Sequence, residues 1–576
     1  MEMQGVHKSD VVAPVTPLAT GQVAAAVLYA ASFAMWLYAE YAARQKRIAV
    51  AHRHVGGDDD EEQQAGSPLL KESSGPKSGK EVAAVQPSLV SQEVPSTDSD
   101  TPEICRVLRL DREALTACRP TLRAAVEFGT IMLWLYLADR TTVFPTSLKS
   151  YSRDLLGFLF LVLTVVAGVT SLRPARTPLL LNRSQTEEWK GWMQVLFLLY
   201  HYFEAREVYN AIRVFIAGYV WMTGYNNFSY YYRTKDFNIA RFCAMMWRLN
   251  FLVAAVCIVM RNSYMLYYIC PMHTLFTVMV YALLGIGAKY NDHRWGVFLK
   301  FAISFVVVFV CWDIKAIFYA LWGFPPLRWL MVYTDPRHPS ADPLHEWYFR
   351  SSLDRYVWIH GMACAYLHPW AEARLQRLDK LTRSQRLLIR AALASAAAGV
   401  MLLWIQHVYL LPKKEYNALH PYTSWIPISA YIVLRNITPN MRVYSMALYG
   451  WLGRITLETY IGQFHTWLAT GIPDGQPKLL LAFLPSGYPL LNFAATSAVY
   501  VFISYRLFHL TDSFRQVLIP DKASGRVLVR NAVSAASAAA VLCAVGALIV
   551  YWSPAVQHYW PVALKRDVGT RFETRL

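Results

Sequence analysis

Charged residues are scarce in this chain, and the motifs of soluble enzymes are missing from its sequence. Only 16% of the 576 residues are Asp, Glu, Lys or Arg, whereas 55% are hydrophobic. The eight cysteines are scattered without a C-x-x-C pair, so no metal site is predicted. Neither a G-x-S-x-G elbow nor the Gly-Asp-Ser block of SGNH esterases occurs. Any catalysis is therefore expected to use groups inside the hydrophobic part of the chain.

Long apolar runs dominate the sequence. A helix needs about 20 apolar residues to cross a bilayer, and roughly twelve to fourteen segments approach that length. The clearest are Val23–Tyr41, Gly157–Val169, Phe251–Met260, Phe301–Val310, Ala391–Trp404 and Ala535–Val550. They recur along almost the whole chain, which predicts an all-α fold: a polytopic transmembrane helix bundle with the lipid bilayer as its partner.

The composition also divides the chain into segments. We expect an N-terminal tail over residues 1–19, a first span over 20–42 and a disordered polar linker over 43–121. A multi-pass membrane domain follows over 122–552, and a basic tail over 553–576. The net charge of +17 lacks a basic–aromatic nucleic-acid module, so no nucleic-acid partner is predicted. By the positive-inside rule, Arg44, Lys46 and Arg47 favour a cytosolic linker.

Ionisable side chains inside apolar helices are costly, so they mark the places where function is expected. Residues 186–201 predict a helix in which Glu187, Gln194 and His201 share one face at heptad spacing, with Glu188 next to Glu187 in the chain. A carboxylate facing an imidazole fixes its tautomer and supports general-base catalysis. The alternative, a core histidine bonded to a neighbouring helix, uses the same residues and stays open.

A second segment, Leu452–His465, repeats this pattern. Glu458 and His465 are again seven residues apart, with Gln463 nearby. Structural and catalytic roles are equally compatible with this spacing. Other candidates for substrate contacts are ionisable groups in or beside apolar runs: Arg248, His273, Asp313, Asp354 and Arg355. Arg248 has the geometry to hold an anionic group, although an arginine near a span end also snorkels to the membrane surface.

Several of these segments carry a family resemblance. The motifs are Gln185–Phe203, Met222–Gly224, Asn227–Tyr232, Met245–Phe251, Tyr267–Phe276, Leu353–Tyr356, His420–Pro427 and Ile455–Ile461. Together they resemble the plant Reduced Wall Acetylation proteins, which are relatives of the fungal capsule-polysaccharide and animal sialate membrane O-acetyltransferases. The resemblance extends from about Gln185 to Leu510. Matching positions include Glu187, Glu188, His201, Arg248, His273, Asp354, Arg355, Glu458 and His465.

The resemblance implies a multi-pass Golgi membrane protein that uses acetyl-CoA to support O-acetylation of cell-wall polysaccharides such as xylan, xyloglucan and pectin. It implies a separate luminal SGNH-type acetyltransferase as a partner, and it places the linker in the lumen, against the charge-based prediction. It does not identify which histidine contacts substrate.

Two functional hypotheses follow. In the first, a central cavity is lined by His201 with Glu187 or Glu188 and by His465 with Glu458. One imidazole acts as general base or as a transient acetyl carrier, and the other polarises the thioester carbonyl. In the second, the same cavity transports acetyl-CoA, or another activated acetyl donor, without breaking a bond. A weaker third hypothesis is a scaffold for wall-synthesis enzymes. The residues by themselves do not separate these hypotheses.

Overall fold

The computed structural model of the protein describes residues 19–55, 111–141, 143–147, 149–334, 340–468, 477–480, 488–520 and 524–552. Most of the expected N-terminal tail, most of the linker and the whole basic tail lie outside the described residues. Within them the fold is helical, and its two short strands, β1 (Leu172–Pro174) and β2 (Tyr444–Met446), form one antiparallel pair.

The longer helices are α1 (Thr20–Val55), α4 (Arg119–Arg140), α5 (Arg153–Ser171), α6 (Arg183–Phe203), α7 (Tyr209–Thr234), α8 (Ile239–Met260), α9 (Ile269–Gly285), α10 (Arg294–Val308), α14 (Val357–Asp379), α15 (Arg383–Trp404), α21 (Pro489–Leu518) and α22 (Gly525–Trp552). The shorter ones are α3 (Arg112–Ala117), α11 (Lys315–Trp322), α12 (Pro325–Met331), α13 (His345–Leu353), α16 (Lys413–Thr423), α17 (Trp425–Asn436), α18 (Pro439–Val443), α19 (Ala447–Arg454) and α20 (Thr456–Gly462). Single turns are η1 (Arg206–Val208), η2 (Tyr264–Tyr267) and η3 (Ala288–Asp292), and the π-helical turns are η4 (Phe309–Asp313), η5 (Ile405–Tyr409) and η6 (Gln463–Trp467).

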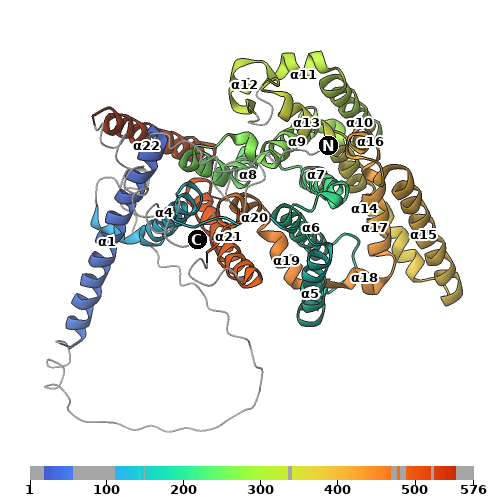
Figure 1. Ribbon diagram of the computed structural model, residues 1–576, viewed down its shortest axis with the longest axis horizontal. Coiled ribbons are helices and arrows are strands. Elements are labelled where there is room, and N and C mark those ends of the chain that lie inside the picture. Colours follow the sequence, from blue (N-terminus) through green and yellow to red (C-terminus); the bar gives the residue numbers. More distant parts are fainter. Residues whose placement is uncertain are drawn as a thin grey trace, which may run out of the picture.

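Eight helices of the described chain are long and apolar enough to cross a membrane, which confirms a polytopic bundle. This number is smaller than the twelve to fourteen spans expected from the sequence. The helices α6, α7 and α14 have the required length, but they carry more polar residues and bury one side or more against their neighbours. Figure 1 shows α1, α4 and α22 on one side of the molecule, α14, α15 and α17 on the other, and α6, α7 and α20 between them.

Glycines allow the central helices to pack with their backbones in contact. A Cβ atom on Gly191 of α6 would lie 1.9 Å from the carbonyl oxygen of Tyr449, and one on Gly453 would lie 1.9 Å from that of Glu187. The helices α7 and α14 use Gly224 and Gly361 in the same reciprocal way. Small residues at helix contacts are typical of membrane bundles, because close packing there replaces the hydrophobic effect. These contacts fix α6 along α19, which leads directly into α20.

Helices occupy both ends of the segment predicted as a linker, residues 43–121. The helix α1 continues past residue 42 to Val55, and α3 and α4 already begin at Arg112 and Arg119. Asp111 caps α3 by accepting a hydrogen bond from the backbone N–H of Glu113. A small apolar cluster of Ala39, Leu115 and Leu122 packs α3 and α4 against α1. Helical structure therefore begins before residue 121, the last residue of the predicted linker.

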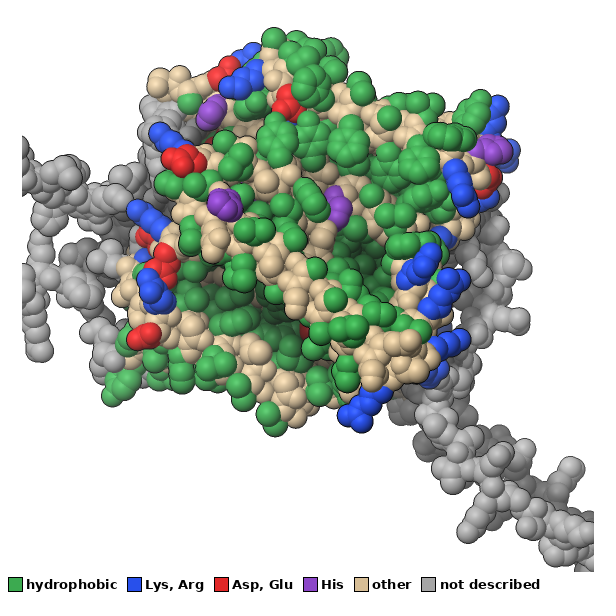
Figure 2. Space-filling view, turned by 90° about the vertical axis from the view of Figure 1, so that its right-hand side faces the viewer, with side chains coloured by type: hydrophobic (Ala, Val, Ile, Leu, Met, Phe, Trp, Pro, Cys, Tyr) green, Lys and Arg blue, Asp and Glu red, His purple; other side chains and the backbone are tan. Residues whose placement is uncertain are grey.

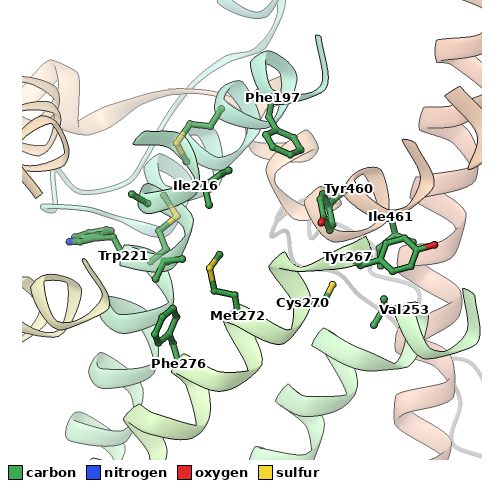
Figure 3. Packing of buried hydrophobic residues seen from close by; sticks show 14 of the residues in the cluster. Phe197, Ile216, Trp221, Val253, Tyr267, Cys270, Met272, Phe276, Tyr460 and Ile461 are labelled. Atoms are coloured by element: carbon green, nitrogen blue, oxygen red, sulfur yellow. The ribbon is translucent and has the colours of Figure 1, made fainter. Parts of the chain in front are cut away.

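The main core lies where these central helices meet. Figure 3 shows Phe197 of α6, Trp221 of α7, Phe276 of α9 and Tyr460 of α20 directed into the same region. On the outer face in Figure 2, hydrophobic side chains fill the middle, while charged side chains gather toward the left and right margins. This distribution is the one expected of a protein whose middle contacts hydrocarbon and whose two ends contact water.

Candidate functional site

The two helices singled out in the sequence lie side by side. From α6, the side-chain amide of Gln194 donates to the hydroxyl of Thr459 (3.0 Å) and to the carbonyl of Thr456 (3.3 Å) on α20. Aromatic pairs continue the contact, with the rings of Phe197 and Tyr460 centred 6.0 Å apart. The two segments therefore form one structural unit, which is what a shared site requires.

His465 lies in η6, the π-helical turn that continues α20. Its Nδ1 is 2.9 Å from Oδ2 of Asp139, which comes from the last turn of α4, and its Nε2 is hydrogen-bonded to the hydroxyl of Tyr267. The side-chain amide of Asn262 donates to the same Tyr267 oxygen at 3.0 Å. In the tautomer that carries its proton on Nδ1, the imidazole donates to Asp139 and Nε2 accepts the proton of the Tyr267 hydroxyl.

This arrangement is a carboxylate–imidazole–hydroxyl chain of the kind that general-base catalysis uses. Asp139, His465 and Tyr267 are almost fully buried; the side chain of Asp139 is 1% exposed, and the other two residues are 0% exposed. In a site of low dielectric the carboxylate acts strongly on the imidazole, because no water screens it. π-Helical turns are themselves frequent at functional sites.

The predicted pairing of Glu458 with His465 is wrong. Glu458 forms a bidentate ion pair with Arg248 of α8, in which the distance from Nη2 to Oε2 is 3.0 Å. Heptad spacing places two residues on one face only while the helix stays regular, and η6 interrupts that regularity between them. Arg248 thus holds a buried carboxylate of its own chain.

The predicted support of His201 by Glu187 or Glu188 is also wrong. Fourteen residues separate Glu187 from His201, and at about 1.5 Å per residue they lie about 21 Å apart along α6. Glu187 instead contacts Lys190 at 2.7 Å, and Glu188 contacts Arg435 at 3.2 Å. His201 lies at the other end of α6, between the rings of Phe197 and Tyr200. Sharing a face of a long helix did not bring these groups together.

Three of the predicted substrate-contact residues form polar contacts around the start of α14. Arg355 donates two hydrogen bonds to Asp313 (2.9 and 3.2 Å), and the hydroxyls of Tyr356 and Tyr422 donate to the same carboxylate. Asp354 accepts a hydrogen bond from Arg213 at 2.8 Å and lies 3.4 Å from Nε2 of His420.

The remaining two predicted contacts behave differently. His273 of α9 is bonded through Nδ1 to the hydroxyl of Thr223 at 2.6 Å, across the α7–α9 contact. Gln463 is completely buried beside His465, and its side-chain amide has no hydrogen-bond partner among the described residues. A buried amide without a partner is unusual, and it marks Gln463 as a group that a substrate oxygen would satisfy.

Sequence reasoning missed four residues of these clusters: Asp139, Tyr267, Arg213 and His420. Arg213 interrupts the apolar stretch of residues 211–220, so the rule about charges inside spans would have found it. Asp139 gave no such signal, because an Asp followed by an Arg at the end of a span is typical of the membrane surface. Within the residues that the structure describes, no group of three or more His, Cys, Asp and Glu side chains is placed to hold a metal ion.

Comparisons with known proteins agree with a membrane enzyme. Residues 81–532 match the family described as the 10 TM acyl transferase domain found in Cas1p. The chain is also 31% identical over 430 residues to N-acetylneuraminate (7)9-O-acetyltransferase of Danio rerio, a match that covers 71% of this chain. The chain spans about half of that relative, since the match covers 52% of it. No solved structure matches.

Proposed function

The chain belongs to the membrane O-acetyltransferase family that carries the ten-span acyltransferase domain, and from this premise we propose that it transfers acetyl groups from acetyl-CoA to hydroxyl groups. We further propose that it works in the Golgi membrane and that its acceptors are cell-wall polysaccharides such as xylan. The resemblance of its motifs to the plant Reduced Wall Acetylation proteins supports this acceptor class. A luminal SGNH-type acetyltransferase is the partner proposed on the same ground.

The observation that carries the proposal is the chain of hydrogen bonds from Asp139 through His465 to Tyr267. The acceptor oxygen attacks the thioester carbonyl while its proton passes to the Tyr267 hydroxyl, whose own proton moves to Nε2 of His465. Asp139 stabilises the imidazolium that forms. When the carbon–sulfur bond breaks, the proton returns along the same path to the departing thiolate.

We assign the polarisation of the thioester carbonyl to Gln463, because its buried amide has no hydrogen-bond partner among the described residues. Its amide N–H groups lie in a dry site, where a hydrogen bond to the developing oxyanion is worth more than in water. Because His465, Tyr267 and Gln463 are all fully buried, substrates reach them only when the segments that cover them separate.

The test uses the purified full chain in detergent, with acetyl-labelled CoA and a xylan oligosaccharide. The His465→Ala variant should lose release of CoA and labelling of the acceptor, because no base remains for the acceptor proton. His293→Ala is the matched control, since that histidine is exposed at the start of α10. Full activity of the His465→Ala variant would refute the assignment of His465.

The same protein in proteoliposomes separates the enzyme from a transporter of the acetyl donor. Release of free CoA identifies bond breaking by this chain. Intact acetyl-CoA accumulating in the vesicle lumen without release of CoA would instead identify transport, and the catalytic proposal would then fail.

A further inference from the structure

A cavity of about 670 Å³ lies between α10, α14 and the junction of α16 with α17. Its volume is within the range of about 300–1,000 Å³ that is usual for small-molecule sites. The residues that line it include Phe298, Phe301 and Phe305 of α10, and none of Asp139, Tyr267 and His465. The cavity is therefore separate from the proposed catalytic groups.

Aromatic rings form most of the cavity wall. Phe298 and Phe301 lie with their ring centres 6.4 and 6.3 Å from that of Tyr366, and Phe305 stacks on Tyr356 at 6.0 Å. The one histidine in the lining, His360, is hydrogen-bonded through Nε2 to Ser429 at 3.1 Å. The cavity thus offers mainly apolar contacts to whatever it binds.

The mouth of the cavity opens onto the membrane-facing surface. Phe298, Leu367 and Trp425 line the cavity and are 55%, 52% and 48% exposed. Phe298 belongs to the candidate span Arg294–Asp313, and from this we infer that its side of the mouth faces the bilayer.

One end of the cavity is polar. Asp313 ends the span, and its ion pair with Arg355 is joined by the hydroxyls of Tyr356 and Tyr422, two residues of the lining. From Phe305 to Phe298 the wall continues for about 10 Å along α10, away from that polar end. Arg355 and Asp313 present one charge of each sign at this end, which matches the two opposite charges of a zwitterionic head group.

We propose that this cavity binds one acyl chain of a zwitterionic bilayer phospholipid. The chain lies along Phe298, Phe301 and Phe305, and the head group lies toward Arg355 and Tyr422. The apolar wall, the mouth on the lipid-facing surface and the polar group at one end match the three parts of such a lipid. The protein would thus bind one lipid molecule in a defined site, in addition to the bilayer lipids that surround it.

The experiment places the full chain in nanodiscs of phosphatidylcholine that contains a small fraction of a diazirine-labelled acyl chain. After illumination, peptide mapping should find the label concentrated on α10 and α14. The Ala363→Trp variant fills the cavity from its wall, and labelling of these helices should fall about tenfold because the ring occupies the volume that the chain needs.

The matched control is Ala398→Trp, which adds the same ring to an exposed position of α15 and should label like the wild type. Label spread evenly over all lipid-facing helices, or unchanged in Ala363→Trp, would overturn the proposal. Labelling of α10 and α14 that acetyl-CoA suppresses would also overturn it, because the cavity would then hold the acyl donor.

Discussion

Replacing Asp139 by Asn tests the proposed catalytic chain most directly. The substitution keeps the size of the side chain but removes the charge that faces Nδ1 of His465. An amide can also present N–H to Nδ1, which favours the tautomer with the proton on Nε2. In that tautomer the imidazole no longer accepts the proton of Tyr267, so the base is lost while the fold is kept.

The structure sets the size of the effect. The Asp139–His465 bond is 2.9 Å long and buried, and a hydrogen bond to a charged group contributes about 1.5–3 kcal/mol, or about 10- to 150-fold in rate. The wrong tautomer adds to this, since the equivalent change in a serine protease lowers kcat about 10⁴-fold. We therefore expect kcat of Asp139→Asn to fall by about 10² to 10⁴, with KM nearly unchanged.

The assay measures kcat and KM for labelled acetyl transfer and, on the same sample, thermal unfolding in detergent. Asp512→Asn is the control, because it neutralises a carboxylate in a surface ion pair of α21. If the activity of Asp139→Asn stays within about threefold of the wild type, the reasoning is refuted. Such a result would mean that the bond between Asp139 and His465 does not contribute to the rate-limiting proton transfer.

Three further outcomes are expected. Tyr267→Phe should lower kcat about 10- to 100-fold by removing the relay hydroxyl, and an unchanged kcat would show that the proton reaches His465 directly. Gly191→Ala should lower the free energy of unfolding by at least about 1–3 kcal/mol, because the added Cβ meets a backbone carbonyl, whereas Gly399→Ala, with open space around it, should not. Arg248→Ala should cost about 3–5 kcal/mol by leaving Glu458 buried and unpaired; the double variant with Glu458→Ala should recover part of this loss in denaturant unfolding.

The sequence by itself determined the class of the protein and singled out the segments to which we assign its chemistry. Long apolar runs require helices in a bilayer, because a lipid-exposed backbone must satisfy its hydrogen bonds internally. Charged and polar residues inside those runs singled out the segments around His201 and His465, and the structure packs these segments together. Local properties such as hydropathy and helical periodicity suffice for such conclusions.

Only the tertiary structure decided which charged and polar side chains are partners. His465 and its carboxylate partner Asp139 are 326 positions apart, and Glu458 finds Arg248 from 210 positions away. Helical periodicity predicts neighbours within one regular helix. Here the π-helical turn η6 breaks that regularity, and the carboxylate partner of His465 comes from α4. In a dry interior each charge must find a partner from whatever helix lies beside it, and helix packing, set by the glycine contacts and the core, determines that choice.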